Sequence, residues 1–164
     1  MTTTTLSQPG AIPARPLWPR LLMACPPQQV RQVANALALQ HRVDDIQLPQ
    51  SGLALLKLRD SAQGEAYFPG EIPLATARVR VSARDGAVVE GAAQLLDDRA
   101  TLARAIAVID AVLAGQLQGH EAALSLLTAG AAQLTEQAAQ RRALLSTTRV
   151  DFSLLGTTED DQDD

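Results

Sequence analysis

The chain has 164 residues and a formal net charge of −4, and 46% of its residues are hydrophobic although only 2% are aromatic. This length suits a single domain that buries roughly two thirds of the surface exposed by the unfolded chain. Five acidic residues lie within positions 159–164, so the net charge of −4 leaves +1 on the remainder. A near-neutral body with an acidic tail argues against binding to nucleic acid.

Cysteine content and apolar runs indicate the compartment. Cys25 is the only cysteine, which excludes an internal disulfide and a cysteine-rich metal site and favours a reducing environment. Residues 1–14 hold no basic residue and no apolar run, and nowhere do about eighteen uncharged apolar residues follow one another. We therefore expect a cytoplasmic protein that neither is exported nor spans a membrane.

Composition divides the chain into three parts. Residues 1–14, with four consecutive threonines, Pro9, Gly10 and Pro13, are predicted to be a flexible segment. Residues 15–155 are predicted to form one domain, and residues 156–164 an acidic disordered tail.

Helical spacing of apolar residues predicts a helix over 15–24, anchored by Trp18, and a second over 27–39 that begins at Pro26 and Pro27. The apolar stripe of the first contains Leu17, Trp18, Leu21 and Leu22, and that of the second Val30, Val33, Ala34 and Leu37.

Alternating apolar and charged residues predict strands over 52–60, 76–82 and 87–95. Asp85-Gly86 predicts a tight hairpin between the last two, because glycine accepts the positive φ of such a turn. Segments 42–48 and 66–68 are further strand candidates.

Asp97 and Asp98 are expected to cap a helix that ends at Gly115. Residues 120–145 are predicted to be one helix or two, since Gly130 weakens a helix by about 1 kcal/mol relative to alanine. The order of elements indicates an α+β fold: an antiparallel sheet of about four strands covered by N-terminal and C-terminal helices. The buried stripe of the helix after Asp98 contains Leu102, Ile106, Ile109 and Leu113.

A search for catalytic and ligand-binding patterns gives little. His41 and His120 are the only histidines, both at predicted helix boundaries, and Cys25 is interpreted as a buried small side chain. Neither short metal-ligand spacings nor a phosphate-cradling glycine motif is present. We expect no catalytic, cofactor-binding or metal-binding residue in this chain.

Two features remain open. Arg78 and Arg80 share one face of a strand, about 7 Å apart by strand geometry, and Arg59 is a candidate third member of this group. These arginines either bind phosphate oxygens or belong to a solvated or ion-pairing face. Residues 147–155 carry four large apolar side chains after the last helix. Either they pack on this domain or they form an arm laid on another chain.

Several stretches resemble one family, the G subunit (PhnG) of bacterial carbon-phosphorus lyase, from about Arg15 to Leu155. The matching stretches are Arg149-Val150-Asp151-Phe152, Gly64 to Glu71, Ala77 to Val81, Ala103 with Ala107 to Ala111, and the early Trp18. Asp97-Asp98-Arg99 stands where that family usually has Gly-Arg-Asp, and Ser153 replaces a second aromatic residue.

The resemblance implies a subunit of a complex with the H, I and J subunits that lets bacteria use phosphonates. It implies support for making alpha-D-ribose 1-methylphosphonate 5-triphosphate from ATP and methylphosphonate, with S-adenosylmethionine and an iron-sulfur cluster used on other subunits. This chain alone would be non-catalytic, with Arg78 and Arg80 as phosphate-facing candidates. Alternatives are a stand-alone phosphate-binding enzyme and a homodimeric binding domain. The expected partner interface consists of Trp18, Arg149, Val150, Asp151 and Phe152.

Overall fold

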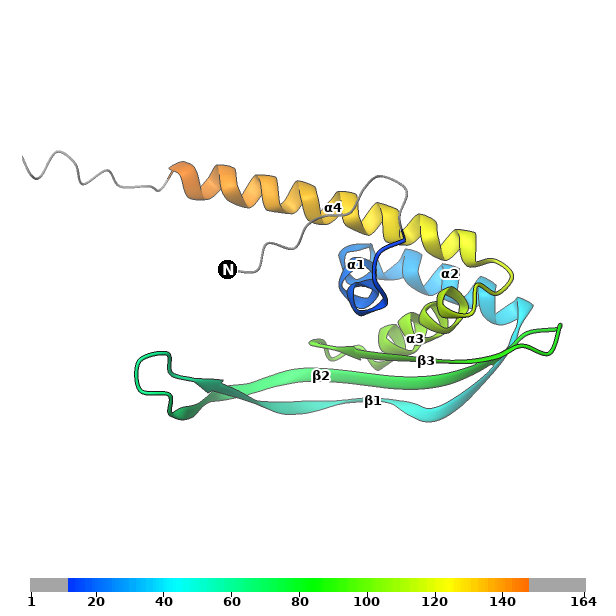
Figure 1. The fold of residues 1–164 in the computed structure, drawn as a ribbon, viewed down its shortest axis with the longest axis horizontal. Helices are drawn as coiled ribbons and strands as arrows, with labels where there is room; N and C mark the ends of the chain where they lie inside the picture. The colour runs from blue at the N-terminus through cyan, green and yellow to red at the C-terminus, as the bar shows by residue number, and fades with distance from the viewer. Residues whose placement is uncertain (1–11, 148–164) are drawn as a thin grey trace, which may run out of the picture.

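The computed structural model describes residues 12–147. Two helices precede a three-stranded sheet and two follow it (Figure 1), so the fold is α+β as the sequence predicts. The elements are the 3-10 helix η1 (Arg15–Leu17), α1 (Trp18–Ala24), α2 (Pro27–Gln40), β1 (Arg42–Arg59), β2 (Ala66–Ser82), β3 (Val88–Leu95), α3 (Ala100–Ala114) and α4 (His120–Thr147).

Prolines mark the start of the N-terminal helices, where the missing N–H would be unpaired in any case. Helix α1 buries Trp18, and the Trp18 indole N–H donates a hydrogen bond of 2.7 Å to the Pro13 carbonyl. Trp18 thus anchors α1, as expected. The other buried residues are Leu21 and Leu22 in α1 and Val30, Ala34 and Leu37 in α2.

The sheet is antiparallel, in the order β1-β2-β3. The expected count of about four strands is wrong, because the candidates at 42–48 and 52–60 merge into β1, and those at 66–68 and 76–82 merge into β2. Pro49 does not interrupt β1, since β1 is an edge strand and a register shift between Gln47 and Gln50 accommodates it.

The predicted hairpin at Asp85-Gly86 is confirmed. Gly86 has a φ of +91°, and the Ala83 N–H donates to the Ala87 carbonyl to close the turn between β2 and β3. The turn places Arg80 opposite Glu90 and Val79 opposite Gly91 in the register.

Helix α3 covers one face of the sheet, α1 and α2 lie above α3, and α4 lies outermost (Figure 1). Close packing of α3 on β3 requires Gly91, because a Cβ there would lie 2.1 Å from the Ala107 carbonyl oxygen. The predicted stripe of α3 is buried, and Gly115 is its C-cap residue. Side chains facing α3 from the sheet include Ala77, Val79, Val81, Ala93 and Leu95.

The predicted cap of α3 is wrong in detail. Arg99 occupies the N-cap position, and no side chain caps the helix. Asp97 instead accepts hydrogen bonds from the Arg99 backbone N–H (2.8 Å) and the Arg99 Nε (2.7 Å). The hydrogen bond from the Arg99 side chain is the main reason that the pKa of Asp97 falls to about 2.

Residues 120–147 form one continuous helix, which settles the alternative of one helix or two. Gly130 does not break α4 but is buried where α4 crosses α1, and a Cβ at Gly130 would lie 2.1 Å from the Leu21 carbonyl oxygen. Beyond this crossing, the second half of α4 is mostly exposed and extends past the helical body.

Candidate functional site

The outer face of the sheet brings Arg78 and Arg80 together around Glu90. The Arg80 Nη2 lies 2.9 Å and the Arg78 Nη2 3.4 Å from oxygens of the Glu90 carboxylate. The hydrogen bond from Arg80 is the main cause of the lowered pKa of Glu90. Arg59 does not join them, since it pairs with Ala66 at the far end of β1.

Glu90 competes with any anionic ligand for both guanidinium groups. Asp44 stands opposite Arg80 on the other side, in the β1–β2 register, so carboxylates flank Arg80 in both neighbouring strands. This arrangement has the features of an ion-pairing face. Phosphate binding by Arg78 and Arg80 stays a prediction, to be checked by titrating the chain with ATP.

The histidines and the cysteine occupy helix boundaries and core positions. The His41 Nε2 donates to the Gln118 carbonyl at 2.8 Å, and the His120 Nδ1 lies 3.0 Å from the Leu117 carbonyl oxygen. The Cys25 thiol is buried and lies 3.3 Å from the Leu126 carbonyl oxygen, and burial raises the pKa of Cys25. A raised pKa keeps the sulfur in its unreactive thiol form.

Metal ligation finds no support in the part of the chain that the structure describes. Within residues 12–147, no group of three or more His, Cys, Asp or Glu side chains is close enough to hold a metal ion. The described helices also include none with the length and apolar character needed to cross a membrane.

The expected partner-interface residues fall into two groups. Trp18 is only 6% exposed, so a partner could touch little of it without a movement of η1 or α1. Arg149, Val150, Asp151 and Phe152 lie outside the described residues. Their contact with a partner remains a prediction.

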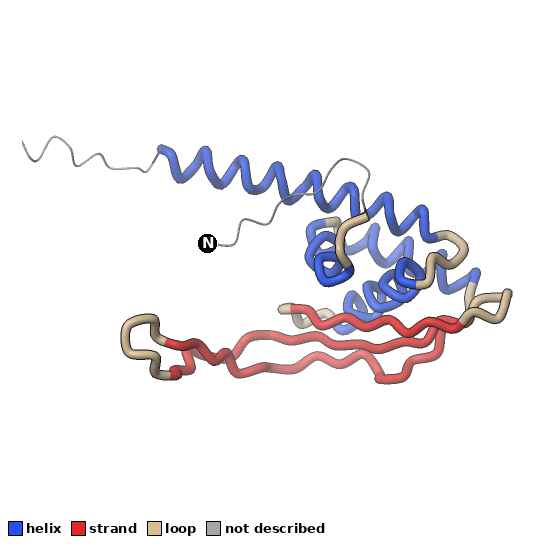
Figure 2. Tube along the Cα trace, viewed as in Figure 1, coloured by secondary structure: helices blue, strands red, loops and turns tan. Residues whose placement is uncertain are grey.

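Strands β1 and β2 extend well past the end of β3 as a two-stranded ribbon (Figure 2). Because β3 pairs only with residues 75–82 of β2, we define the β-arm as residues 52–74. Its eight residues in β1 span about 26 Å at the usual rise of a strand. The β-arm leaves five large side chains at least 40% exposed: Leu53, Leu55, Leu58, Tyr67 and Phe68.

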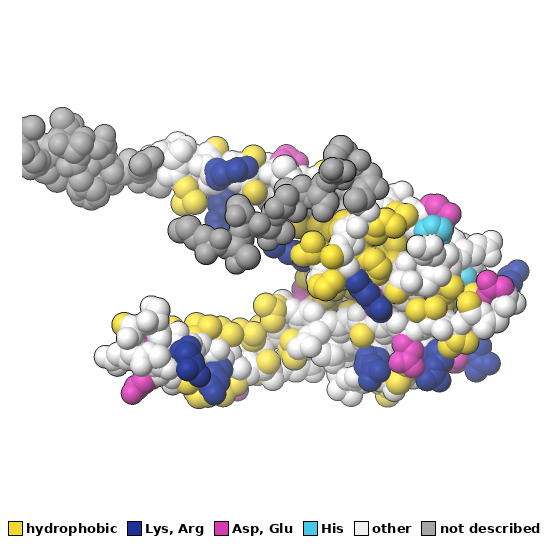
Figure 3. Space-filling model, in the orientation of Figure 1, with side chains coloured by type: hydrophobic (Ala, Val, Ile, Leu, Met, Phe, Trp, Pro, Cys, Tyr) yellow, Lys and Arg dark blue, Asp and Glu magenta, His cyan; other side chains and the backbone are white. Residues whose placement is uncertain are grey.

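These side chains emerge from both faces of the β-arm. Alternation along β1 places Leu53 and Leu55 on one face, while Leu58 lies opposite Tyr67 on the other. In the space-filling view, hydrophobic side chains lie along the surface of the β-arm that faces α4 (Figure 3). Two apolar faces on one ribbon form an interaction surface that the helical body does not cover.

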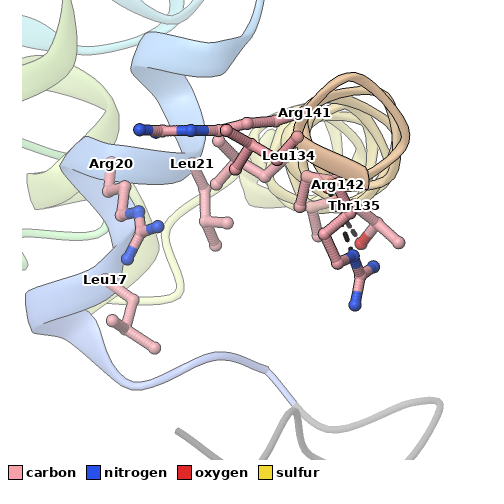
Figure 4. A pocket seen from close by; sticks show the side chains of 10 residues that line it. Leu17, Arg20, Leu21, Leu134, Thr135, Arg141 and Arg142 are labelled. Atoms are coloured by element: carbon pink, nitrogen blue, oxygen red, sulfur yellow. Dashed lines mark hydrogen bonds between the residues drawn. The ribbon is translucent and has the colours of Figure 1, made fainter. Parts of the chain in front are cut away.

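A second exposed apolar surface lies between α1 and α4. It is a groove of about 570 Å³ with Leu17, Leu21, Leu134 and Ala138 among its apolar lining residues. Arg20, Arg141 and Arg142 also line it, from both helices (Figure 4).

A protein-family comparison identifies the chain. The family model described as phosphonate metabolism protein PhnG matches residues 13–156. The chain belongs to the PhnG family. A search of curated proteins gave no match. The matched range covers the whole described helical body, the β-arm and the Arg149 to Phe152 motif, in agreement with the resemblance from about Arg15 to Leu155.

Sequence reasoning missed one polar residue of this PhnG family member. Asp110 is 5% exposed and accepts hydrogen bonds from the Arg15 Nε (2.9 Å), the Arg15 Nη2 (2.7 Å) and the Ala92 backbone N–H (3.0 Å). These bonds tie η1, α3 and β3 together. The available signal was a single carboxylate within the apolar run from Ala105 to Leu113.

The β-arm and the groove were also missed. Neither surface corresponds to a sequence motif. The β-arm forms because β1 and β2 are longer than β3, and the groove forms because α4 is longer than α1. The leucine-rich run at 53–58 is the available signal, but its alternation with charged residues predicts only a strand over 52–60.

Proposed function

We propose that this chain is a non-catalytic subunit of the carbon-phosphorus lyase core complex, assembled with the H, I and J subunits in the cytoplasm. In that role it supports formation of alpha-D-ribose 1-methylphosphonate 5-triphosphate from ATP and methylphosphonate. Membership of the PhnG family supports the link to phosphonate metabolism. The use of ATP, S-adenosylmethionine and the iron-sulfur cluster is assigned to the other subunits.

The β-arm is the observation that carries this proposal. A two-stranded hairpin is at best marginally stable in water, and one with apolar side chains on both faces gains stability when another surface covers it. Leu53 is 68% and Leu55 60% exposed, so burying both against a partner removes a large apolar area from water. Binding of another protein chain fits this surface better than binding of a small molecule.

Residues Arg149, Val150, Asp151 and Phe152 are proposed as a second contact, on the I or J subunit. Val150 and Phe152 supply apolar anchors, while Arg149 and Asp151 set the register through paired charges. This contact would flank the one made by the β-arm, since α4 and the β-arm extend past the helical body in the same direction (Figure 1).

Co-purification tests the proposal. A tagged chain is co-expressed with the H, I and J subunits, and the complex is isolated by affinity and size-exclusion chromatography with mass determination. We expect stoichiometric co-elution of the natural chain. The double variant Leu53→Asp/Leu55→Asp should lower the affinity for the partners at least about tenfold, because two buried apolar anchors are lost.

The matched control is Leu39→Asp, since Leu39 is 85% exposed on α2 and lies outside the β-arm. It should co-elute like the natural chain. A natural chain that remains alone in the presence of all three subunits would refute the subunit role. Unchanged assembly of the double variant would refute the β-arm as the contact surface.

A further inference from the structure

The groove between α1 and α4 opens where the two helices diverge. At their crossing, Gly130 lets the α4 backbone approach that of Leu21. Further along α4, Leu17 of η1 and Leu21 of α1 lie on one wall of this space, and Leu134 of α4 lies on the other (Figure 4). Ala138 of α4 also lines it. An apolar groove next to a helix end is a surface on which a chain segment can pack.

The groove carries a positive charge that the described residues do not neutralise. Arg20, Arg141 and Arg142 all line it. Within residues 12–147, no carboxylate forms an ion pair with any of the three. The one hydrogen bond that their guanidinium groups donate in that range runs from the Arg142 Nε to the Ala138 carbonyl oxygen at 3.2 Å. An occupant that combines apolar and acidic residues would therefore complement the groove.

Residues 148–164 have this combination, and they follow directly after the end of α4 at Thr147. Residues 1–11, the other part of the chain outside the description, contain no aspartate or glutamate. Charge therefore selects the C-terminal segment over the N-terminal one. The segment holds the large apolar residues Val150, Phe152, Leu154 and Leu155, and the acidic residues Asp151, Glu159, Asp160, Asp161, Asp163 and Asp164.

The length of the segment fits the groove. From Ala131 to Leu145 the α4 wall is about 21 Å long at the rise of a helix. Residues 150–155, in extended form, span about 17 Å, so after a reversal of direction beyond Thr147 they cover most of that wall. The acidic residues that follow are then within reach of Arg20, near the α1–α4 crossing.

We propose that in the free chain residues 149–164 fold back into the α1–α4 groove of the same molecule. The apolar residues 150–155 cover its hydrophobic wall, Asp151 pairs with Arg141 or Arg142, and the acidic end pairs with Arg20 near the crossing. This inference concerns the free chain and does not depend on which subunits are its partners. Docking of Arg149 to Phe152 on a partner then requires the segment to leave the groove.

Paramagnetic relaxation enhancement in the full chain tests the fold-back. A nitroxide is attached to Ser153→Cys, and the buried Cys25 thiol, 4% exposed, is left unlabelled. We expect strong broadening of the backbone amide signals of Leu21, Leu134 and Ala138. A nitroxide at Arg84→Cys, in the exposed turn after β2, is the matched control and should leave these signals sharp.

Two perturbations probe the charge contribution. The triple variant Arg20→Glu/Arg141→Glu/Arg142→Glu should reduce the broadening, whereas Arg31→Glu/Arg59→Glu/Arg84→Glu should retain it. Raising the salt concentration from about 0.1 M to about 1 M shortens the screening length from about 10 Å to about 3 Å and should weaken the broadening without any substitution.

Absence of broadening in the full chain at low salt would overturn the proposal. Mixing an isotope-labelled chain with a separate spin-labelled chain distinguishes the source of the segment. Broadening in that mixture equal to that within one molecule would assign the groove to a second copy and would also overturn it. Retention of full broadening in both the triple variant and about 1 M salt would reject the arginine contacts.

Discussion

Asp110 is the most deeply buried charged side chain of the described chain, and its carboxylate has hydrogen-bond partners. Only His41 and Asp110 are buried polar residues in that part of the chain. The Asp110 carboxylate receives three hydrogen bonds, and Arg15 also donates to the Glu90 carbonyl at 3.2 Å. The pair therefore fixes the start of the helical body against α3 and β3, and burial of the carboxylate depends on Arg15.

The variant Arg15→Ala should lower the free energy of unfolding by about 2 kcal/mol, because it removes two charge-assisted hydrogen bonds from a buried carboxylate. Adding Asp110→Asn should cost less in that background than in the natural chain, since the unpaired charge disappears. Urea denaturation measures both. Arg84→Ala, at an exposed turn, is the control and should change stability by less than about 0.5 kcal/mol. Strict additivity of the two substitutions would contradict this account of the pair.

Periodicity along the chain predicted the helices better than the strands. The apolar stripes from Val30 to Leu37 and from Leu102 to Leu113 repeat over two or more turns, which is enough to predict helices α2 and α3. The stripe understates the burial of α3, in which every residue from Leu102 to Leu113 except Arg104 is buried. The long strands contain prolines and register shifts that divide their pattern into short pieces. Whether such pieces join into one strand depends on pairing with the neighbouring strand, and the sequence alone does not show which strands are neighbours.

Gly130 illustrates the same limit at the crossing of α1 and α4. Helix propensity predicts that Gly130→Ala stabilises α4 by about 1 kcal/mol. The structure predicts the opposite, because the added Cβ would lie 2.1 Å from the Leu21 carbonyl oxygen and would push the helices apart. We expect a net destabilisation of about 1–3 kcal/mol, measured by thermal and urea unfolding.

Gly52→Ala is the control for this substitution, since nothing lies within 4 Å of a Cβ at Gly52. It should change stability far less than Gly130→Ala. A stabilised Gly130→Ala variant would mean that the crossing is looser than the structure indicates.

For the molecule as a whole, one hydrophobic core joins all the helices to the sheet. Trp18 from α1, Val30 from α2, Val79 from β2, Ile106 from α3 and Leu127 from α4 belong to one cluster. This core agrees with a composition rich in aliphatic and poor in aromatic residues, since Trp18 is the one aromatic side chain in the cluster. Composition could not predict the projecting β-arm, because the β-arm exists only where β3 is too short to pair with β2.

A shared core predicts cooperative unfolding. Trp18 is the only tryptophan, so its fluorescence reports on the α1 region, while circular dichroism at 222 nm reports on all the helices. The two urea transitions should coincide, because α1 cannot leave the cluster without exposing residues of its neighbours. A fluorescence midpoint clearly below the circular dichroism midpoint would indicate that α1 unfolds separately from the rest.

The open edges of the β-arm also affect the fate of the chain before assembly. Residues 53–58 combine five apolar side chains with a single charge, Lys57, and no other strand of the described chain pairs with the outer edge of β1. Such edges promote strand-to-strand aggregation, which Lys57, Pro69 and Pro73 counteract only in part. A cell that makes this chain in excess of the proposed partners would therefore accumulate insoluble protein, so the proposed complex would require balanced synthesis of its subunits.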